Sequence, residues 1–475
     1  MPTARLTCLF ALICLAASAP AADFVPPDPP ETARPLGAGL QRAMTLLATS
    51  TPTHHNRVRI LYYGQSITAQ PWTGQVTAWL KAQYPNADIQ AENRAIGGFT
   101  APSLIRTAEH DLYNFYPDLL IFHVYGGDKT GELEKIIARV RQRTTADILI
   151  RTPHYRWDAN VPADGSPDDP RHKGAIDADE QQAVFIRSLA DKYNLELADT
   201  RLGWQSYLTK TGLHAKDLLA DGIHLNPRGN QLMAALVIPH LRYLPDQPTD
   251  AWRDRMRDVP LADAAVTRLP DGAVELRFTG NRVDALAAPA APTLGTASLL
   301  IDGQPPTAFD ELLTTSRPTV SYKMWWPALN VAAHDKPRVA EKWTLRITKV
   351  DAEAKNFWFT VSGSVTGPDG EGERAKRFVS NSGRLVVEPG DWWMEATQRY
   401  ANNAVVPEGF EVTWEVKPNY QALYQAVAAT DPARDTATML VQGLKPGEHT
   451  LRLVPKGDGA LNLAGFRVYN PPMAP

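Results

Sequence analysis

Between Arg57 and Tyr243, short apolar runs alternate with stretches of helical periodicity. Apolar residues recur at helical spacing at Val76, Trp79 and Leu80, and again from Leu133 to Val140. Strands that alternate with helices form a parallel sheet covered on both faces. The sequence therefore predicts an α/β domain over residues 57–244. The strands are expected at Ile60–Tyr63, Ile89–Ile96, Leu119–Val124, Ile148–Ile150 and Leu195–Ala198.

The pattern changes after Leu244. Residues 245–260 have little periodicity, and we interpret them as a linker. Beyond them, short strand-like runs follow one another, separated by turn signals such as Asp302-Gly303. This pattern is typical of an all-β sandwich or jelly roll, expected over residues 261–475. The Trp-rich centre, 309–420, is a candidate insertion. The runs are Val274–Phe278, Ala297–Ile301, Trp343–Ile347, Phe357–Val361, Phe410–Val416, Thr450–Val454 and Phe466–Tyr469.

The first 21 residues have the pattern of an export signal. Arg5 precedes the apolar stretch Leu6–Ala17, which is too short to span a bilayer, and Ala19-Pro20-Ala21 offers a cleavage site. We therefore expect a secreted or periplasmic protein with a bacterial-type signal, followed by an N-terminal extension over 22–56. Both cysteines lie inside the signal, which excludes disulfides and thiolate chemistry from the mature chain. No later segment predicts a transmembrane span.

The charge balance is nearly neutral. With 49 basic and 52 acidic residues, the net charge of −3 gives no reason to expect nucleic acid as a partner. The 12 tryptophans include two adjacent pairs in the β region. Such pairs either stack on sugars or pack in the core of a sandwich, and both interpretations stay open. The pairs are Trp325-Trp326 and Trp392-Trp393.

A serine, an aspartate and a histidine occupy informative positions. Ser66 follows the first predicted strand, where the active site of a parallel sheet is expected. Asp221 and His224 come just before the last helix. A nucleophilic serine needs a base, and the base needs a carboxylate to fix its tautomer. The alternative is that Asp221 caps the helix near Pro227 and His224 is an ordinary loop residue.

Three sequence blocks together resemble the SGNH, or GDSL-type, hydrolase family. Ser66 lies in the first, Asn93–Thr100 looks like the second block of carbohydrate acetylesterases, and Asp221–Gly229 looks like the last. The resemblance implies a flavodoxin-like three-layer fold and a serine esterase with a catalytic Ser66, Asp221 and His224. It further implies an oxyanion held by backbone N–H groups of Ser66 and Gly98, and neither metal nor organic cofactor. The implied substrate is a carbohydrate or another acylated molecule or polymer.

Two positions depart from the family pattern. The aspartate that usually precedes the serine is Gln65, and the asparagine of the third block is replaced by Gly127. Loss of such an oxyanion donor typically costs about 10²–10³-fold in rate. We expect the N–H of Gly127, or a neighbour such as His123, to substitute. On this view a Gly127→Asn variant should raise kcat.

The remaining candidates are two strand-end histidines. His123 and His154 follow the third and fourth predicted strands, and each is either a substrate contact or a packed residue. Two other functions are possible on the same scaffold. One is a catalytically decayed hydrolase that binds glycan. The other is a different sugar-directed chemistry, with Asp128 or Asp221 as acid or base.

Overall fold

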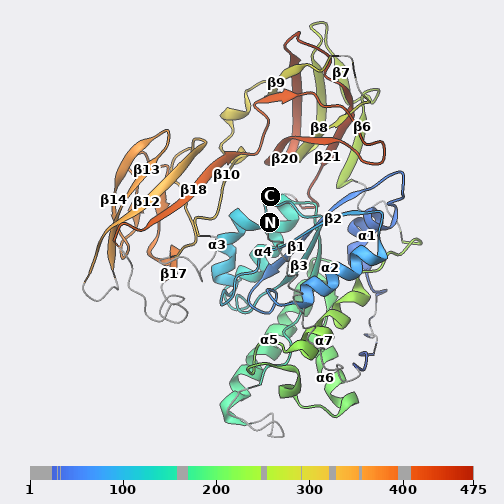
Figure 1. The fold of residues 1–475 in the computed structure, drawn as a ribbon, viewed down its shortest axis with the longest axis vertical. Coiled ribbons are helices and arrows are strands. Elements are labelled where there is room, and N and C mark those ends of the chain that lie inside the picture. Colours follow the sequence, from blue (N-terminus) through green and yellow to red (C-terminus); the bar gives the residue numbers. More distant parts are fainter. Residues whose placement is uncertain are drawn as a thin grey trace, which may run out of the picture.

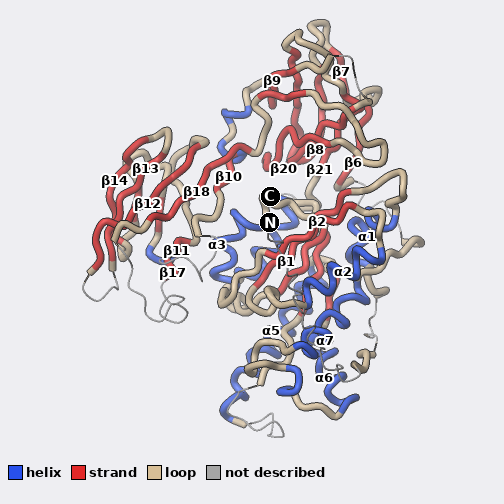
Figure 2. The backbone as a smooth tube through the Cα atoms, in the orientation of Figure 1, coloured by secondary structure: helices blue, strands red, loops and turns tan. Residues whose placement is uncertain are grey.

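A computed structural model describes most of the chain after the predicted signal, which itself lies outside the described residues. An α/β domain carries two antiparallel β units, one beside α3 and one above the parallel sheet (Figure 1). The long helices gather in the α/β domain, while the β units consist of strands and loops with short helical turns (Figure 2). The described residues are 24–28, 30, 32, 34–157, 169–247, 254–289, 291, 293–319, 328–351, 356–393 and 408–473.

The α/β domain contains a five-stranded parallel sheet of order β2-β1-β3-β4-β5, which confirms the predicted fold class. All five strands end at the same edge, so the loops after β1, β2 and β3 are neighbours. The strand β2 ends at Asn93, earlier than predicted, because the chain turns there toward α3. The strands are β1 (Arg57–Gly64), β2 (Asp88–Asn93), β3 (Leu119–His123), β4 (Asp147–Arg151) and β5 (Glu196–Ala198).

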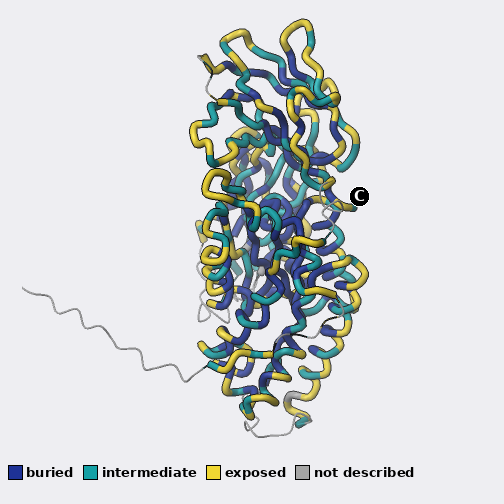
Figure 3. The backbone as a smooth tube through the Cα atoms, turned by 90° about the vertical axis from the view of Figure 1, so that its right-hand side faces the viewer, coloured by how far each residue is buried: buried dark blue, intermediate teal, exposed yellow. Residues whose placement is uncertain are grey.

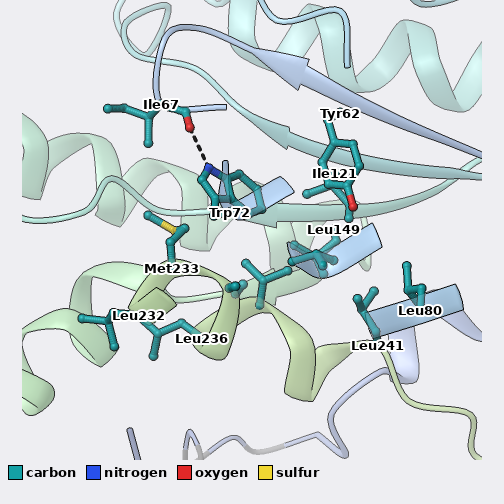
Figure 4. Packing of buried hydrophobic residues seen from close by; sticks show 14 of the residues in the cluster. Tyr62, Ile67, Trp72, Leu80, Ile121, Leu149, Leu232, Met233, Leu236 and Leu241 are labelled. Atoms are coloured by element: carbon teal, nitrogen blue, oxygen red, sulfur yellow. Dashed lines mark hydrogen bonds between the residues drawn. The ribbon is translucent and has the colours of Figure 1, made fainter. Parts of the chain in front are cut away.

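Helices cover both faces of this sheet, and each face has its own apolar core. Trp72 is completely buried in the core beneath α2 and α7 (Figure 4). The segment predicted only as an N-terminal extension contributes α1 to that same core, through Ala43, Met44 and Leu47. The helices are α1 (Gln41–Ala48), α2 (Trp72–Gln83), α3 (Ala101–Asp111), α4 (Glu132–Arg143), α5 (Pro170–Lys192), α6 (Thr200–Thr211) and α7 (Pro227–Val237), with short 3₁₀ turns η1 (Ala38–Leu40), η2 (Ala215–Leu218) and η3 (Ile238–His240).

The first β unit is an antiparallel sheet of order β19-β9-β20-β8-β21-β6, with β7 paired to β8. Period-2 burial along β9 explains why its sequence predicts a strand. The domain boundaries drawn from the sequence stay predictions. The strands are β6 (Met256–Pro260), β7 (Val266–Arg268), β8 (Val274–Ala287), β9 (Thr296–Ile301), β19 (Leu423–Gln425), β20 (Ala437–Pro455) and β21 (Leu463–Tyr469), and η4 (Pro306–Ala308) and η5 (Asp310–Leu312) follow β9.

The second β unit lies in the chain between β9 and β19. Its main sheet has the order β10-β18-β12-β13-β14, and two small two-stranded sheets flank it. Trp343, Trp392 and Trp414 are buried in its core, so Trp392 packs as a core residue. Trp325, Trp326 and the side chain of Trp393 lie outside what is described. The strands are β10 (Leu313–Thr315), β11 (Ala328–Leu329), β12 (Glu341–Val350), β13 (Phe357–Gly363), β14 (Gly367–Glu373), β15 (Phe378–Val379), β16 (Val386–Val387), β17 (Trp392–Trp393) and β18 (Glu411–Pro418), with η6 (Pro389–Asp391) before β17.

Polar contacts fasten both β units to the α/β domain. Asn114 donates to Thr314 Oγ1 at 2.7 Å, and Tyr116 donates to Asn281 Oδ1 at 2.7 Å. Buried segments run through the middle of the molecule, where the parallel sheet lies (Figure 3). Within the described part of the chain, no helix combines the length and the apolar character needed to cross a membrane.

Candidate active site

A sharp turn at the end of β1 presents Ser66. Gly64 has a φ of 154°, and a side chain there would collide with the carbonyl oxygen of His123 on the neighbouring strand. The side-chain oxygen of Gln65 then accepts the N–H of Ile67 at 2.7 Å, and its carbonyl accepts the N–H of Thr68 at 2.9 Å. Gln65, which stands where the family usually has an aspartate, therefore holds the turn through its side-chain and backbone oxygens.

Ser66, His224 and Asp221 form one hydrogen-bonded chain. His224 Nε2 lies 3.0 Å from Ser66 Oγ, and His224 Nδ1 lies 2.8 Å from Asp221 Oδ2. Partial burial raises the pKa of Asp221, but hydrogen bonds from His224 and from the Ile223 N–H outweigh it and hold that pKa below its ordinary value. The carboxylate thus stays ionised and fixes the Nδ1–H tautomer, which leaves Nε2 free to act as a base. The geometry suits a triad, and the catalytic roles remain predictions.

The loop that carries Asp221 and His224 is anchored from below. His154 Nε2 lies 2.7 Å from the carbonyl oxygen of Ile223, and the N–H of Trp157 donates to the carbonyl of Gly222 at 2.7 Å. Gly222 is buried, so the bond from Trp157 satisfies a carbonyl that would otherwise have no partner. Residues after β4 therefore position the loop that holds the proposed base.

Gln70 links the nucleophile turn directly to the histidine loop. Its Oε1 accepts the N–H of Leu225 at 3.1 Å, and its Nε2 donates to the carbonyl of Leu225 at 3.2 Å. Since Leu225 follows His224 and Gln70 follows Ser66 by one turn, this pair of bonds fixes the separation of nucleophile and base. A loop glutamine has no distinctive sequence signal, and the sequence analysis missed it.

The helix α7 begins with its own cap. Asn226 Oδ1 accepts the N–H of Gly229 at 2.9 Å, and Pro227 occupies the first turn, where its missing N–H costs nothing. The alternative in which Asp221 caps this helix is therefore wrong, because Asn226 does so. Asp221 is left free to bond to His224.

The two glycines expected to bind the oxyanion both lie in turns with positive φ. Gly98 has a φ of 82° on an exposed turn, and Gly127 has a φ of 77° in a buried one. The N–H of Ile96 donates to the carbonyl of Gly64 at 2.9 Å, which ties the Gly98 turn to the nucleophile turn. Within the described residues, the N–H groups of Ser66, Gly98 and Gly127 donate to no protein acceptor. They are thus available to a bound oxyanion.

The environment of Gly127 overturns one expectation. A Cβ at this position would lie 2.6 Å from Ala101 Cβ and 2.8 Å from the Leu133 backbone nitrogen. The positive φ would tolerate asparagine, but the packing of α3 and α4 leaves no room for any side chain. Gly127→Asn therefore distorts the loop rather than adding a donor. At Gly126, in contrast, the nearest atom to an added Cβ is Thr100 Cβ at 3.7 Å.

The two strand-end histidines lie beneath the site and are almost completely buried. Gln65 Nε2 lies 3.0 Å from His123 Nδ1. Burial, reinforced by the charge of Arg151, lowers the pKa of His123 well below its ordinary value and that of His154 to about 3. Both rings are neutral at physiological pH and bond to site loops, which favours positioning over substrate contact. Arg156 is likewise occupied, in a bidentate pair with Asp179.

Comparison with known proteins identifies the domain. Residues 62–232 match the model of the GDSL-like Lipase/Acylhydrolase family. No curated protein matches the chain. Similar solved structures include Axe2, an acetylxylan esterase from Geobacillus stearothermophilus, at 19% identity over 41% of this chain and 98% of that one, with a TM-score of 0.33. Another is a putative GDSL-like lipase from Parabacteroides merdae, at 17% identity over 40% and 98%, with a TM-score of 0.34.

The segment 62–232 is a GDSL-like lipase/acylhydrolase domain, which confirms the resemblance carried by the three sequence blocks. The match begins in the strand that leads to Ser66 and includes Asp221 and His224. The protein is accordingly a hydrolase that acts on ester bonds.

Proposed function

We propose that this protein is an exported serine esterase that removes acetyl or another small acyl group from carbohydrate. The hydrogen-bonded chain Ser66–His224–Asp221 carries the proposal, because it supplies nucleophile, base and orienting carboxylate at the expected distances. The predicted export signal supports a substrate outside the cell, and the likeness of Asn93–Thr100 to carbohydrate acetylesterases supports an acylated sugar.

The reaction follows from these groups. Ser66 Oγ attacks the ester carbonyl while His224 Nε2 takes its proton, and His224 then gives that proton to the leaving alcohol. A water molecule then attacks the acyl-serine while His224 Nε2 takes its proton. His224 returns that proton to Ser66 Oγ as the carboxylic acid leaves. Asp221 stabilises the imidazolium that forms in each step. The backbone N–H groups of Ser66, Gly98 and Gly127 donate hydrogen bonds to the oxyanion of the tetrahedral intermediate and so stabilise its negative charge.

The site is open to solvent. The side chains of His224 and Asp221 are 39% and 59% exposed. An open site admits an ester that projects from a large alcohol, as an acetyl group does from a polysaccharide. The lowered pKa of Asp221 argues against the acid role in the alternative sugar chemistry, since an acid must carry a proton at working pH.

The test compares wild type, Ser66→Ala and a control, Ser188→Ala, whose hydroxyl bonds within α5 far from the triad in sequence. Substrates are p-nitrophenyl acetate and an acetylated xylo-oligosaccharide, with released acetate as the measure. We expect wild type and the control to hydrolyse both and Ser66→Ala to hydrolyse neither. Activity on the small ester alone would refute the carbohydrate assignment. Full activity of Ser66→Ala would refute the triad, and glycan binding without any hydrolysis would favour the decayed-hydrolase alternative.

A further inference from the structure

A buried arginine lies at the same edge of the parallel sheet as the nucleophile turn, two strands away from β1. Arg151 ends β4 and has no exposed surface. In the parallel register, Phe122 on β3 pairs with Ile150 on β4, so the next residues, His123 and Arg151, stand side by side on the same face. Its guanidinium lies 5.4 Å from the centre of the Trp72 ring.

No charged group among the described residues pairs with Arg151. Within the described residues, neither Nη1 nor Nη2 has a hydrogen-bond partner, and the guanidinium forms no salt bridge. Two other buried arginines of this domain differ in this respect. Arg42 pairs with Asp118 at 2.7 Å, and Arg201 pairs with Glu180 at 2.5 Å. An unpaired buried charge is strongly destabilising, so Arg151 needs an anionic partner, and none of the described residues supplies one.

His123 adds a third donor beside the two guanidinium nitrogens. Because Gln65 Oε1 accepts the N–H of Ile67, Gln65 Nε2 is the group that faces His123, and His123 Nδ1 must accept its proton. The neutral ring therefore carries its own hydrogen on Nε2. That nitrogen is buried and has no hydrogen-bond partner among the described residues.

We propose that a monovalent inorganic anion, chloride in the first instance, binds between the guanidinium of Arg151 and the Nε2–H of His123. A water molecule accepts at most two hydrogen bonds and brings no charge, whereas a halide accepts all three and neutralises the arginine.

The anion would support the nucleophile turn from below. On one side, His123 bonds to Gln65, which holds the N–H of Ile67. On the other, the Trp72 ring lies against Arg151, and its Nε1 donates to the Ile67 carbonyl at 2.6 Å (Figure 4). The site stands on this geometry alone and does not depend on the proposed carbohydrate substrate.

Bromide is the probe for wild-type protein. Crystals grown in sodium bromide should show an anomalous peak within hydrogen-bond distance of both Arg151 and His123. In solution, chloride and bromide should raise the melting temperature in a saturable way relative to sodium gluconate at equal ionic strength, as a ligand specific to the native state does. Ordered water at this position, with no anomalous signal and no halide-specific shift, would overturn the proposal.

Variants separate this site from general salt effects. Arg151→Met, which removes the charge at similar length, should lose the halide-specific shift. The matched control Arg201→Met also loses a buried guanidinium, but one with a carboxylate partner, so it should keep that shift. Equal halide dependence in Arg151→Met and wild type would contradict the proposal. If Arg151→Met does not fold, the bromide experiment on wild type still decides.

Discussion

The two halves of the candidate active site, the Ser66–His224 half and the predicted oxyanion half, are held in different ways. Side-chain hydrogen bonds hold the nucleophile and base half, through Gln65, Gln70 and His154. Backbone conformation and close packing hold the oxyanion half, where Gly98 and Gly127 have positive φ and Gly127 has no space for a side chain. In the hydrogen-bonded half, substitutions can remove one bond at a time, so the loss is graded. In the close-packed half, a single added side-chain atom already causes a steric clash.

The largest effect is expected from the triad itself. Ser66→Ala and His224→Ala should each lower kcat/KM on p-nitrophenyl acetate by about 10⁴–10⁶-fold, and the double variant should be little worse, because the two residues share one step. Asp221→Asn should retain more activity than either. Losses that multiply in the double variant would show that Ser66 and His224 act separately.

The adjacent glycines Gly126 and Gly127 test whether close packing holds the oxyanion half. Gly127→Asn should destabilise the protein by about 1–3 kcal/mol, since its Cβ would overlap Ala101 and the Leu133 backbone. Gly126→Asn is the matched control, because an added Cβ there has room and asparagine tolerates its φ of 74°. Urea unfolding of both variants gives the comparison. Wild-type stability together with a raised kcat in Gly127→Asn would restore the original expectation for that position.

A smaller, graded loss is expected in the hydrogen-bonded half. Gln70→Ala removes both bonds to Leu225 and should lower kcat by about 10–100-fold while KM changes little, because the nucleophile and base lose their fixed separation without any loss of substrate contact. Gln75→Ala, on the exposed side of α2, is the control. A change confined to KM would instead place Gln70 in substrate binding.

The most gradual effect concerns pH and the buried histidines. Burial lowers the pKa of His110 to about 4 and that of His154 to about 3, against 6.5 when exposed. Below about pH 6.5 these histidines bind protons in the unfolded chain but stay neutral in the native protein. The free energy of unfolding should therefore decrease as the pH is lowered from 6.5 toward 4. Each histidine contributes at most about 1.4 kcal/mol per pH unit, and above pH 6.5 their contribution is constant. His110→Asn should reduce the slope of unfolding free energy against pH, and an unchanged slope would mean that His110 titrates normally.

The sequence determined the features that follow from local periodicity and order. Alternating apolar runs and helical spacing predict the parallel sheet, and its topology puts the turn after β1 next to the loop before α7. Ser66 and the Asp221–His224 pair could therefore be assigned to one edge before any contact was known. The β strands after residue 261 were predictable for the same reason, since their burial alternates with period two.

Only the tertiary structure decided which side chains meet across that framework. The pairing of His123 with Arg151 depends on the register of β3 against β4, and the bonds of Gln70 to Leu225 join segments 155 residues apart. The lack of space at Gly127 comes from α3 and α4 packing on the same loop. A periodic pattern specifies which face a residue occupies, but its partner is chosen by long-range packing, which no local window of sequence contains.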